Sequence, residues 1–346
     1  MATIREVARA ADVSVATVSR VLNNTATVSP NVRDRVLEVA GRMRYGSATR
    51  TPTTHLALVY TGPSSLSSPY DVAILGGMSE AAEAAGFDLV ITQLKPAQRN
   101  ETAAQRLARK GIRGAVLRTT SDTRHVCAEL AREGFPSIVV GDCFDDDPDV
   151  SYICADSRPT SYQAVEHLIS VGHQRIAIVL NQVADHDHQD RLQAYERALR
   201  EHGIEVDPRL VHRAGAQRPN GAQAMRTLMS LRDRPTAIFI ADPPTAIGAI
   251  HQAHEMGVKI PDDVSIIGFD DADVRNDVYP TMSAICQDAH KLGYEAAEAL
   301  SRRLLDPEDV APLRVVHPTW LELHSTVSQP PAVAVRVLPD GSRISW

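Results

Sequence analysis

The 346-residue sequence has few aromatic residues, few cysteines and no long apolar runs. Aromatic residues make up only 4% of the chain while hydrophobic residues make up 43%, so the core must be mostly aliphatic. No apolar run approaches the roughly 18 residues that suggest a membrane span, and residues 1–6 contain no apolar signal segment. We therefore expect neither a membrane partner nor secretion. At roughly 100–200 residues per domain, the length predicts two or three domains.

The four cysteines are scattered and form no Cys-x-x-Cys pair: Cys127, Cys143, Cys154 and Cys286. This spacing argues against a disulfide scaffold or a zinc ribbon and fits a reducing cytoplasm. The sequence also lacks Walker A, G-x-G-x-x-G and G-x-S-x-G motifs. We therefore expect a cytoplasmic protein without a cofactor and without catalytic residues, and not an enzyme.

The net charge of −7 is unevenly distributed. Residues 1–55 contain eight of the 36 basic residues and four of the 43 acidic ones, a net charge of +4. The remaining 291 residues carry 28 basic and 39 acidic residues, a net charge of −11. A small basic segment attached to a large acidic body predicts that only this segment contacts a polyanion such as DNA.

Residues 1–45 have the pattern of three short helices. Thr3 and Glu6 have the spacing of a capping box, Ser14 is placed to cap a second helix, and Ser29-Pro30 opens a third. A tight turn at residues 12–14 joins the first two helices. This pattern predicts a helix-turn-helix whose second helix enters the major groove; the alternative is an ordinary helical hairpin.

The second helix has two chemically different faces. Its inner face carries Val18, Val21 and Leu22, and its outer face carries short or cationic side chains. Arg20 can donate to a guanine, and Val15 or Ala16 can contact a thymine methyl group.

From Leu56 onward, short aliphatic strands alternate with amphipathic helices. The predicted strands are 56–60, 87–92, 114–118, 137–140, 175–180, 236–240 and 264–268. The predicted helices include 73–85, 101–110, 123–133, 160–171 and 191–201. This alternation predicts doubly wound parallel sheets. The segment is too long for one sheet, so we expect two lobes with a ligand site between them, at the carboxyl ends of the strands.

The run from Thr3 to Asn23 resembles the N-terminal signature of the LacI/GalR family of transcriptional regulators, and the match continues through residues 28–30 and Arg33. Residues 165–177, 191–195, 234–239 and 261–271 resemble further signatures of that family, so the resemblance covers nearly the whole chain. It implies an all-α helix-turn-helix head at 1–45, a hinge linker at 46–55 and a body at 56–328. The body would be α/β, two-lobed and periplasmic-binding-protein-like, with two doubly wound parallel sheets and chain crossovers. Residues 329–346 would form a tail, either a hairpin or a flexible extension.

The resemblance also implies a homodimeric repressor. Two heads would read a pseudo-palindromic double-stranded DNA operator, and the lobes would close on a small, sugar-like polar effector. By position, base contacts fall on Val15, Ala16 and Arg20. Contacts to the DNA backbone, which position the head, fall on Thr3, Ser14, Thr17, Ser19, Asn23, Thr27 and Ser29.

The effector residues implied by the resemblance are Asp142, Arg191, Asp242 and Asp270, with Tyr70 and Asp156 as weaker candidates. Carboxylates and an arginine suit a polyol, because hydroxyl groups both donate and accept hydrogen bonds. Any single aspartate has an alternative role as a helix cap or a solvated loop residue.

The sequence departs from the family at the pocket and the hinge. Asp242-Pro243 stands where the family has Asn-Asp, and no aromatic residue stands near Gly215, which leaves open an atypical effector or none. Residues 46–55 are short and lack the leucine that relatives insert into the minor groove at the operator centre. A regulator without small-molecule control therefore stays an alternative. A sugar-binding transport protein is a third reading, but it would need an export signal and no basic head.

Two acidic clusters have residue types that can bind metal ions. Asp185-His186-Asp187-His188 is consecutive, which suits a loop at the pocket rim near Arg191 and not the i,i+4 pair of a helical zinc site. Residues 145–149 contain an Asp-x-Asp-x-Asp spacing but lack the glycine at position six and the glutamate at position twelve of a calcium loop, which favours a solvated acidic turn. We predict no metal at either cluster.

Overall fold

The computed structural model describes residues 3–23, 29–42, 54–62, 66–94, 101–183, 185–306, 311–332, 335–337 and 342–345. The chain divides into two compact units, Met1–Thr54 and His55–Trp346. The predicted DNA contact Thr27 and linker residues 46–53 lie outside the described residues. The predictions about the shortened hinge therefore stay predictions.

In its described part, the first unit consists of α1 (Ile4–Ala10), α2 (Val15–Asn23) and α3 (Pro30–Arg42). The predicted capping box is confirmed, because the Thr3 amide donates to Glu6 Oε2 at 2.6 Å and the Glu6 amide donates to Thr3 Oγ1 at 3.4 Å. Val7, Val18 and Val36 come from the three different helices and are fully buried. Their contact forms the centre of a small aliphatic core.

The second unit contains two lobes, each built on a six-stranded sheet. The sheet of lobe 1 has the order β11-β5-β4-β3-β1-β2, and all its neighbouring strands are parallel. Its strands are β1 (His55–Tyr60), β2 (Asp88–Gln93), β3 (Ile112–Arg118), β4 (Ser137–Val140), β5 (Tyr152–Asp156) and β11 (Arg314–Pro318). Its helices are α4 (Pro69–Ala84), α5 (Ala103–Arg109), α6 (Arg124–Arg132) and α11 (Ala289–Leu305).

The sheet of lobe 2 has the order β12-β10-β9-β8-β6-β7 and is parallel except for the edge strand β12. Its strands are β6 (Ile176–Asn181), β7 (Val211–Ala214), β8 (Ala237–Ile240), β9 (Ser265–Asp270), β10 (Ser283–Cys286) and β12 (Trp320–Glu322). Its helices are α7 (Arg158–Val171), α8 (His186–Glu201), α9 (Arg218–Ser230) and α10 (Pro243–Glu255). Short 3-10 turns occur at η1 (Ser121–Thr123), η2 (Pro208–Leu210) and η3 (Val274–Asn276).

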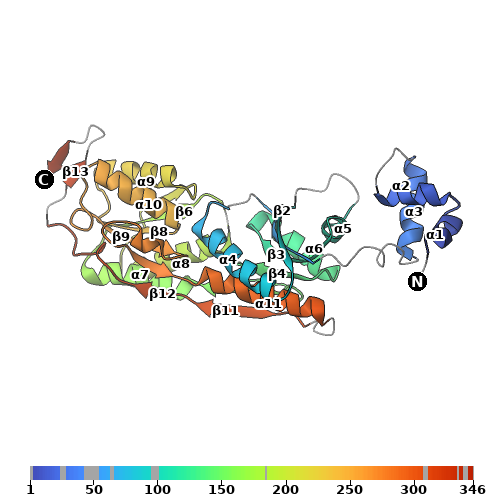
Figure 1. Ribbon diagram of the computed structural model, residues 1–346. Coiled ribbons are helices and arrows are strands. Elements are labelled where there is room, and N and C mark those ends of the chain that lie inside the picture. The colour runs from blue at the N-terminus through green and yellow to red at the C-terminus, as the bar shows by residue number, and fades with distance from the viewer. Residues whose placement is uncertain are drawn as a thin grey trace. The chain divides into compact units, whose positions relative to one another are not determined.

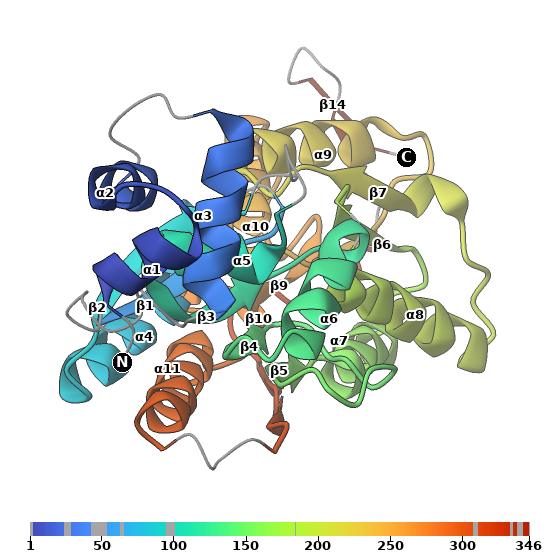
Figure 2. The ribbon, with the colours of Figure 1, turned by 90° about the vertical axis from the view of Figure 1, so that its right-hand side faces the viewer.

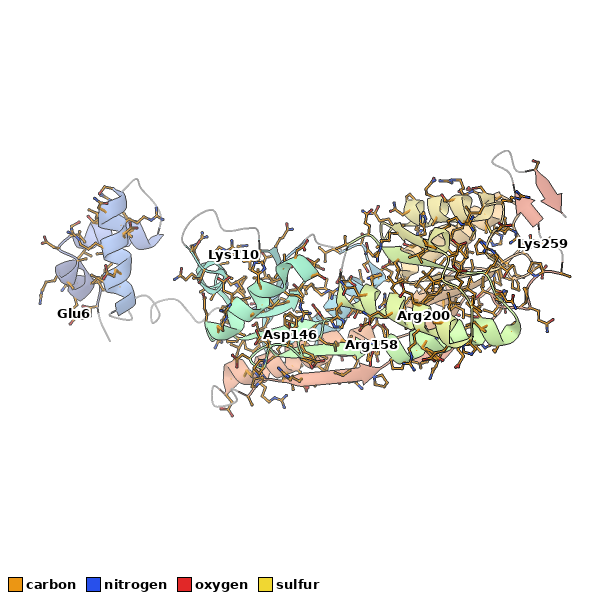
Figure 3. The ribbon with its side chains drawn as sticks, turned by 180° about the vertical axis from the view of Figure 1, so that it is seen from behind. Glu6, Lys110, Asp146, Arg158, Arg200 and Lys259 are labelled. Carbon is orange, nitrogen blue, oxygen red and sulfur yellow. A yellow bond between two sulfur atoms is a disulfide. The ribbon has the colours of Figure 1, made fainter. Side chains whose placement is uncertain are left out.

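Helices cover both faces of each sheet. In lobe 2, α9 and α10 lie on one face and α7 and α8 on the other (Figure 1), each pair over its own aliphatic cluster. In lobe 1, α4 and α11 pack together on one face (Figure 2), and α5 and α6 cover the other. Long charged side chains such as those of Lys110 and Arg200 lie on the outside (Figure 3). The predicted two-sheet α/β class is confirmed.

Two glycines allow α4 and α11 to approach closely. A Cβ atom added at Gly77 would collide with the backbone carbonyl of His290, and one added at Gly293 would collide with that of Ile74. Because backbone cannot move aside as a side-chain tip can, only glycine fits at these two positions.

The described chain crosses between the lobes three times: from β5 to α7, from β10 to α11, and from β11 to β12. Thr319 alone separates β11, in the first sheet, from β12, in the second. The two lobes are therefore joined by short connections, as the expected crossovers require.

A disulfide joins Cys143 and Cys154. The scattered spacing of the cysteines does not predict this bond, because the two residues come together only when β4 and β5 pair in parallel. Cys127 and Cys286 are free and buried.

The tail contains a two-stranded antiparallel hairpin of β13 (Val335–Val337) and β14 (Arg343–Ser345), so the hairpin alternative is confirmed. Strand β13 contacts α9. Within the described residues, no helix combines the length and the apolarity that a membrane crossing requires.

Candidate functional site

The first candidate site is the outer face of α2 in the head. A turn precedes it, in which Asp12 has a φ of 51° and the Val13 amide donates to the carbonyl of Ala8 at 3.0 Å. Ser14 then caps the helix, because its Oγ accepts from the Thr17 amide at 3.0 Å. These local bonds fix where α2 begins relative to α1, as a helix-turn-helix requires.

The side chains of α2 divide between core and solvent. Val18 and Val21 are buried in the core, whereas Val15, Ala16 and Arg20 are exposed. Val15 exposes 41% of its surface. The predicted base-reading residues therefore share one accessible face.

The predicted DNA-backbone residues are also accessible where the structure describes their side chains. Thr3, Ser14 and Ser29 are exposed, and Thr17 and Ser19 are half-buried. Asn23 ends α2, but its side chain lies outside the described atoms.

The second candidate site is a cavity of about 500 Å³ between the two lobes. That volume suits a small ligand. Lobe 1 and lobe 2 both contribute lining residues, from loops at the carboxyl ends of their strands, where open α/β sheets bind ligands. The predicted residues Tyr70, Arg191 and Asp242 line it.

The lobe 1 wall is organised by Arg118, at the end of β3. Its Nε donates to Asp71 Oδ1 at 2.8 Å, its Nη1 donates to the carbonyl of Val140 at 2.7 Å, and its guanidinium stacks on Tyr70. Gly141, with a φ of +78°, passes so close that an added Cβ would collide with both Tyr70 and Arg118. Burial raises the pKa of the Tyr70 hydroxyl, which therefore stays neutral.

The lobe 2 wall begins with Asp185, the N-cap of α8. Its Oδ1 accepts hydrogen bonds from the amide and from Nδ1 of His188, at 2.8 Å and 2.7 Å. Nε2 of His188 lies 3.3 Å from Asp242 Oδ2. Burial opposes protonation of this imidazole, but the attraction of Asp242 and Asp185 outweighs it and raises the pKa of His188 to about 10. His188 is therefore a buried imidazolium between two carboxylates.

Arg191, on the next turn of α8, is only 5% exposed. Its Nη1 donates to the carbonyl of Ala241 at 2.9 Å, its Nε donates to Ser157 Oγ at 3.3 Å, and its guanidinium stacks on Phe269. Asp187 lies 3.6 Å from Nη2 of Arg191. Burial raises the pKa of Asp187 to about 6, against the attraction of Arg191.

Two adjacent carboxylates at the end of β9, Asp270 and Asp271, have different roles. Asp270 is only 1% exposed, and its carboxylate is hydrogen-bonded within the protein. It accepts from the Val274 amide at 2.9 Å and from Arg275 Nη1 at 2.7 Å. Asp271 lines the cavity and accepts a hydrogen bond from Gln287. Burial raises the pKa of Asp271 to about 7, although that bond and Arg191 lower it.

Three predicted effector residues do not line the cavity: Asp142, Asp156 and Asp270. Asp142 is buried beside Arg124, which donates to it and stacks on Phe144. Asp156 accepts from the Arg158 amide at 2.9 Å in the first crossing between the lobes.

The cluster at 185–188 forms the start of α8 and not a loop, and Asp185, Asp187 and His188 line the cavity. The described residues contain no group of His, Cys, Asp or Glu side chains arranged to hold a metal ion. Sequence reasoning missed Arg118, Asp271 and Gln287. Arg118 ends the predicted strand 114–118 and Asp271 follows the predicted strand 264–268, so their positions at strand ends could have identified both. Gln287 follows no predicted strand.

Comparisons with known proteins agree with this architecture. Residues 3–47 match the family of bacterial regulatory proteins, lacI family, and residues 165–326 match the periplasmic binding protein-like domain. The ribose operon repressor of Haemophilus influenzae is 29% identical over 335 residues, which covers 95% of this chain and 99% of the repressor. The HTH-type transcriptional regulator DegA of Bacillus subtilis is 29% identical over 339 residues, covering 94% and 98% of the two chains.

Among solved structures, a complex of the transcriptional regulator CelR with cellobiose is 28% identical, with a TM-score of 0.70 and coverage of 94% of this chain and 100% of that one. A basic helix-turn-helix head followed by a two-lobed body with a cavity defines the class of DNA-binding transcriptional regulators that sense a ligand. Within that class, the head resembles the bacterial regulatory proteins of the lacI family, and residues 165–326 resemble the periplasmic binding protein-like domain.

Proposed function

We propose that the protein is a cytoplasmic repressor that binds a pseudo-palindromic operator as a homodimer and senses a small polar ligand. The head would comprise residues 1–45, the linker 46–55, the body 56–328 and the tail 329–346. The exposure of Val15, Ala16 and Arg20 on one face of α2 carries the proposal. Base readout needs short or cationic side chains that are free to approach the major groove. Thr3, Ser14, Thr17, Ser19, Asn23, Thr27 and Ser29 would contact the DNA backbone.

The ligand would bind between the lobes, against Tyr70, Arg191 and Asp242 and against Asp185, Asp187 and Asp271. The many carboxylate and guanidinium groups in the cavity support a ligand rich in hydroxyl groups. A sugar-like ligand is also supported by the names of two relatives, a ribose operon repressor and a regulator in complex with cellobiose. The relatives are also regulators and not enzymes, which supports a binding role without turnover.

The ligand would control DNA binding through the lobes. Closure of the lobes would change the spacing of the two heads of the dimer. The operator affinity would then change only by the ligand's differential affinity for the two states. A regulator without small-molecule control is the second candidate, and the short linker of residues 46–55 without a leucine favours it.

The test is binding of the purified dimer to its own upstream DNA, measured by fluorescence anisotropy across a salt series. We expect specific, salt-dependent binding. Arg20→Ala should weaken specific binding by about 1–3 kcal/mol and reduce the preference over random DNA. Arg35→Ala, which removes an equally exposed charge from α3, is the matched control and should preserve the preference. If Arg20→Ala leaves the preference intact, the assignment of α2 is wrong.

A further inference from the structure

The cavity carries more negative than positive charge. Its described lining contains four carboxylates, Asp185, Asp187, Asp242 and Asp271, and three cationic side chains, Arg118, Arg191 and His188. Arg118 is already paired with the buried Asp71 at 2.8 Å. The lining together with Asp71 therefore holds five acidic groups against three basic ones when all are ionised.

The cationic groups are engaged with the protein. His188 is shared between Asp185 and Asp242, and Arg191 donates to a backbone carbonyl and a serine hydroxyl and lies 3.6 Å from Asp187. When Asp271 is ionised, one unit of negative charge remains with the Asp185–His188–Asp242 group and another with Asp271. An anionic ligand would add to this excess and would find no unengaged cation among the described lining residues.

Two carboxylates have hydrogen-bonding capacity left over. Asp271 is only 7% exposed, and in the described part of the chain its Oδ1 accepts from Gln287 while its Oδ2 accepts from no group. Asp242 accepts at Oδ2 from His188, and its Oδ1 has no donor among the described residues. Neither of these two oxygens is among the fully buried side-chain atoms that lack a partner in the described residues, so both are open to the cavity. A ligand that supplies a donor there would restore hydration that the protein replaces only in part.

The cavity wall also limits the shape of the ligand. Its aromatic residues are Tyr60 and Tyr70, and Arg118 already stacks on Tyr70. Hydroxyl and amide groups from Ser67, Ser68, Thr119, Gln182 and Asn220 make up much of the remaining wall. Such a lining offers hydrogen bonds to a ligand with many hydroxyl groups and little surface on which a flat aromatic ring would stack.

We infer that the ligand of this cavity is a small polyol that carries a protonated amine, such as an amino sugar, with Asp271 and Asp242 receiving the ammonium group. This inference rests on the proposed ligand-sensing function and specifies its chemistry. An ammonium group supplies three donors and one positive charge. It would therefore satisfy the unpaired carboxylate oxygens and reduce the excess charge at the same time.

The test compares matched compounds on the full-length protein by calorimetry and by thermal unfolding. The amines are glucosamine, galactosamine, mannosamine and glucamine. Their neutral partners are glucose, galactose, mannose and sorbitol, and N-acetylglucosamine retains the nitrogen without the charge. Gluconate and glucose 6-phosphate form the anionic arm. We expect at least one amine to bind about tenfold or more tightly than its neutral and acetylated partners.

Two isosteric variants locate the charge recognition. Asp271→Asn and Asp242→Asn should each reduce the affinity for the amine about tenfold more than the affinity for its neutral partner, because only the amine depends on the carboxylate charge. Asp277→Asn, which alters an exposed carboxylate away from the cavity, is the matched control. Thermal unfolding of each variant without ligand shows whether it is folded.

Other outcomes would overturn the inference. If neutral or anionic compounds bind as tightly as the amines, ligand sensing stands and the amine assignment is wrong. The same conclusion follows if the preference for the amine survives in both variants. If no compound in any arm binds or changes the operator affinity, the amine assignment and the sensing of polyols both fail. The proposed binding of DNA by α2 is tested separately, by the effect of Arg20→Ala on operator affinity.

Discussion

Arg118 and Asp71 form a buried ion pair in lobe 1. Nε of Arg118 donates to Oδ1 of Asp71 at 2.8 Å, and the two side chains are only 19% and 1% exposed. Arg118 also contacts Tyr70 and the end of β4, so the pair links three elements that hold the cavity wall.

Removing the acidic partner should be costly. Asp71→Asn leaves the Arg118 charge largely buried without its counterion, and we expect the free energy of unfolding to fall by about 3 kcal/mol. Glu101→Gln breaks an exposed pair with Arg109 and should cost less than about 1 kcal/mol. Denaturant unfolding of the full chain measures both. Equal losses in the two variants would contradict the role of burial.

His188 should make stability depend on pH. Its pKa is raised from 6.5 to about 10 by Asp242 and Asp185, against the effect of burial. Its contribution is therefore complete below pH 6.5 and is lost as the pH rises through about 10. His188→Gln should be destabilising at about pH 6, and the difference from the unmodified protein should shrink toward pH 10. Urea titrations across this range test it, and a difference that does not change with pH would refute it.

Asp271 should have the opposite effect on stability. Burial raises its pKa from 3.8 to about 7, so folding favours the neutral acid. The stability that the neutral acid contributes is therefore lost as the pH rises from about 4 through about 7. Without ligand, Asp271→Asn should raise the free energy of unfolding by at least about 1 kcal/mol at pH 8, and this gain should vanish near pH 4. Thermal unfolding at the two pH values provides the measurement. A gain of the same size at both would show that the ionisation of Asp271 is not its cause.

The contact of α4 with α11 should tolerate no side chain at Gly293. Gly293→Ala places a methyl group against the carbonyl of Ile74, and we expect a loss of about 2–3 kcal/mol. Gly203→Ala is the matched control, because Gly203 has a φ of +71° and no neighbour within 4 Å of an added Cβ. The control should cost only the backbone strain, about 1 kcal/mol. Denaturant unfolding compares the two, and a smaller loss at Gly293 than at Gly203 would contradict the packing argument.

The strands that carry aliphatic runs could be predicted from the sequence because both faces of a parallel sheet are buried. Five of the six residues of β1 are buried, which explains its continuous apolar pattern. Strand β7, Val-His-Arg-Ala, is mostly half-buried or exposed and was missed. Strand β11 lies at an edge and alternates between exposed and half-buried residues, so it gave no such run. The edge strand β2 was nevertheless predicted, and the buried strands β5 and β10 were missed, so a local apolar pattern identifies only part of each sheet.

The position of the cavity could be predicted from the sequence, but its lining residues could be predicted only in part. Strand ends and family motifs indicated Asp242 and Arg191, but they could not decide which of Asp270 and Asp271 lines the cavity. The difference arises because Val274 and Arg275, which lie in η3, donate hydrogen bonds from their amides to Asp270, and Arg275 also donates from its guanidinium group. The pairing of Arg118 with Asp71 joins residues 47 positions apart and depends on how α4 packs on the sheet. Such pairs follow from tertiary packing and not from spacing.

The three crossings have a consequence for biosynthesis. Lobe 1 needs β1 to β5 and also α11 and β11, and lobe 2 needs β12 in addition to its central segment. Neither sheet can be completed until the ribosome has translated past residue 318 for the first and past residue 322 for the second. The helices of the head are encoded entirely within the first 42 residues. A chain that terminates early would therefore emerge with its DNA-reading helices present but with both sheets of the ligand-binding unit unfinished.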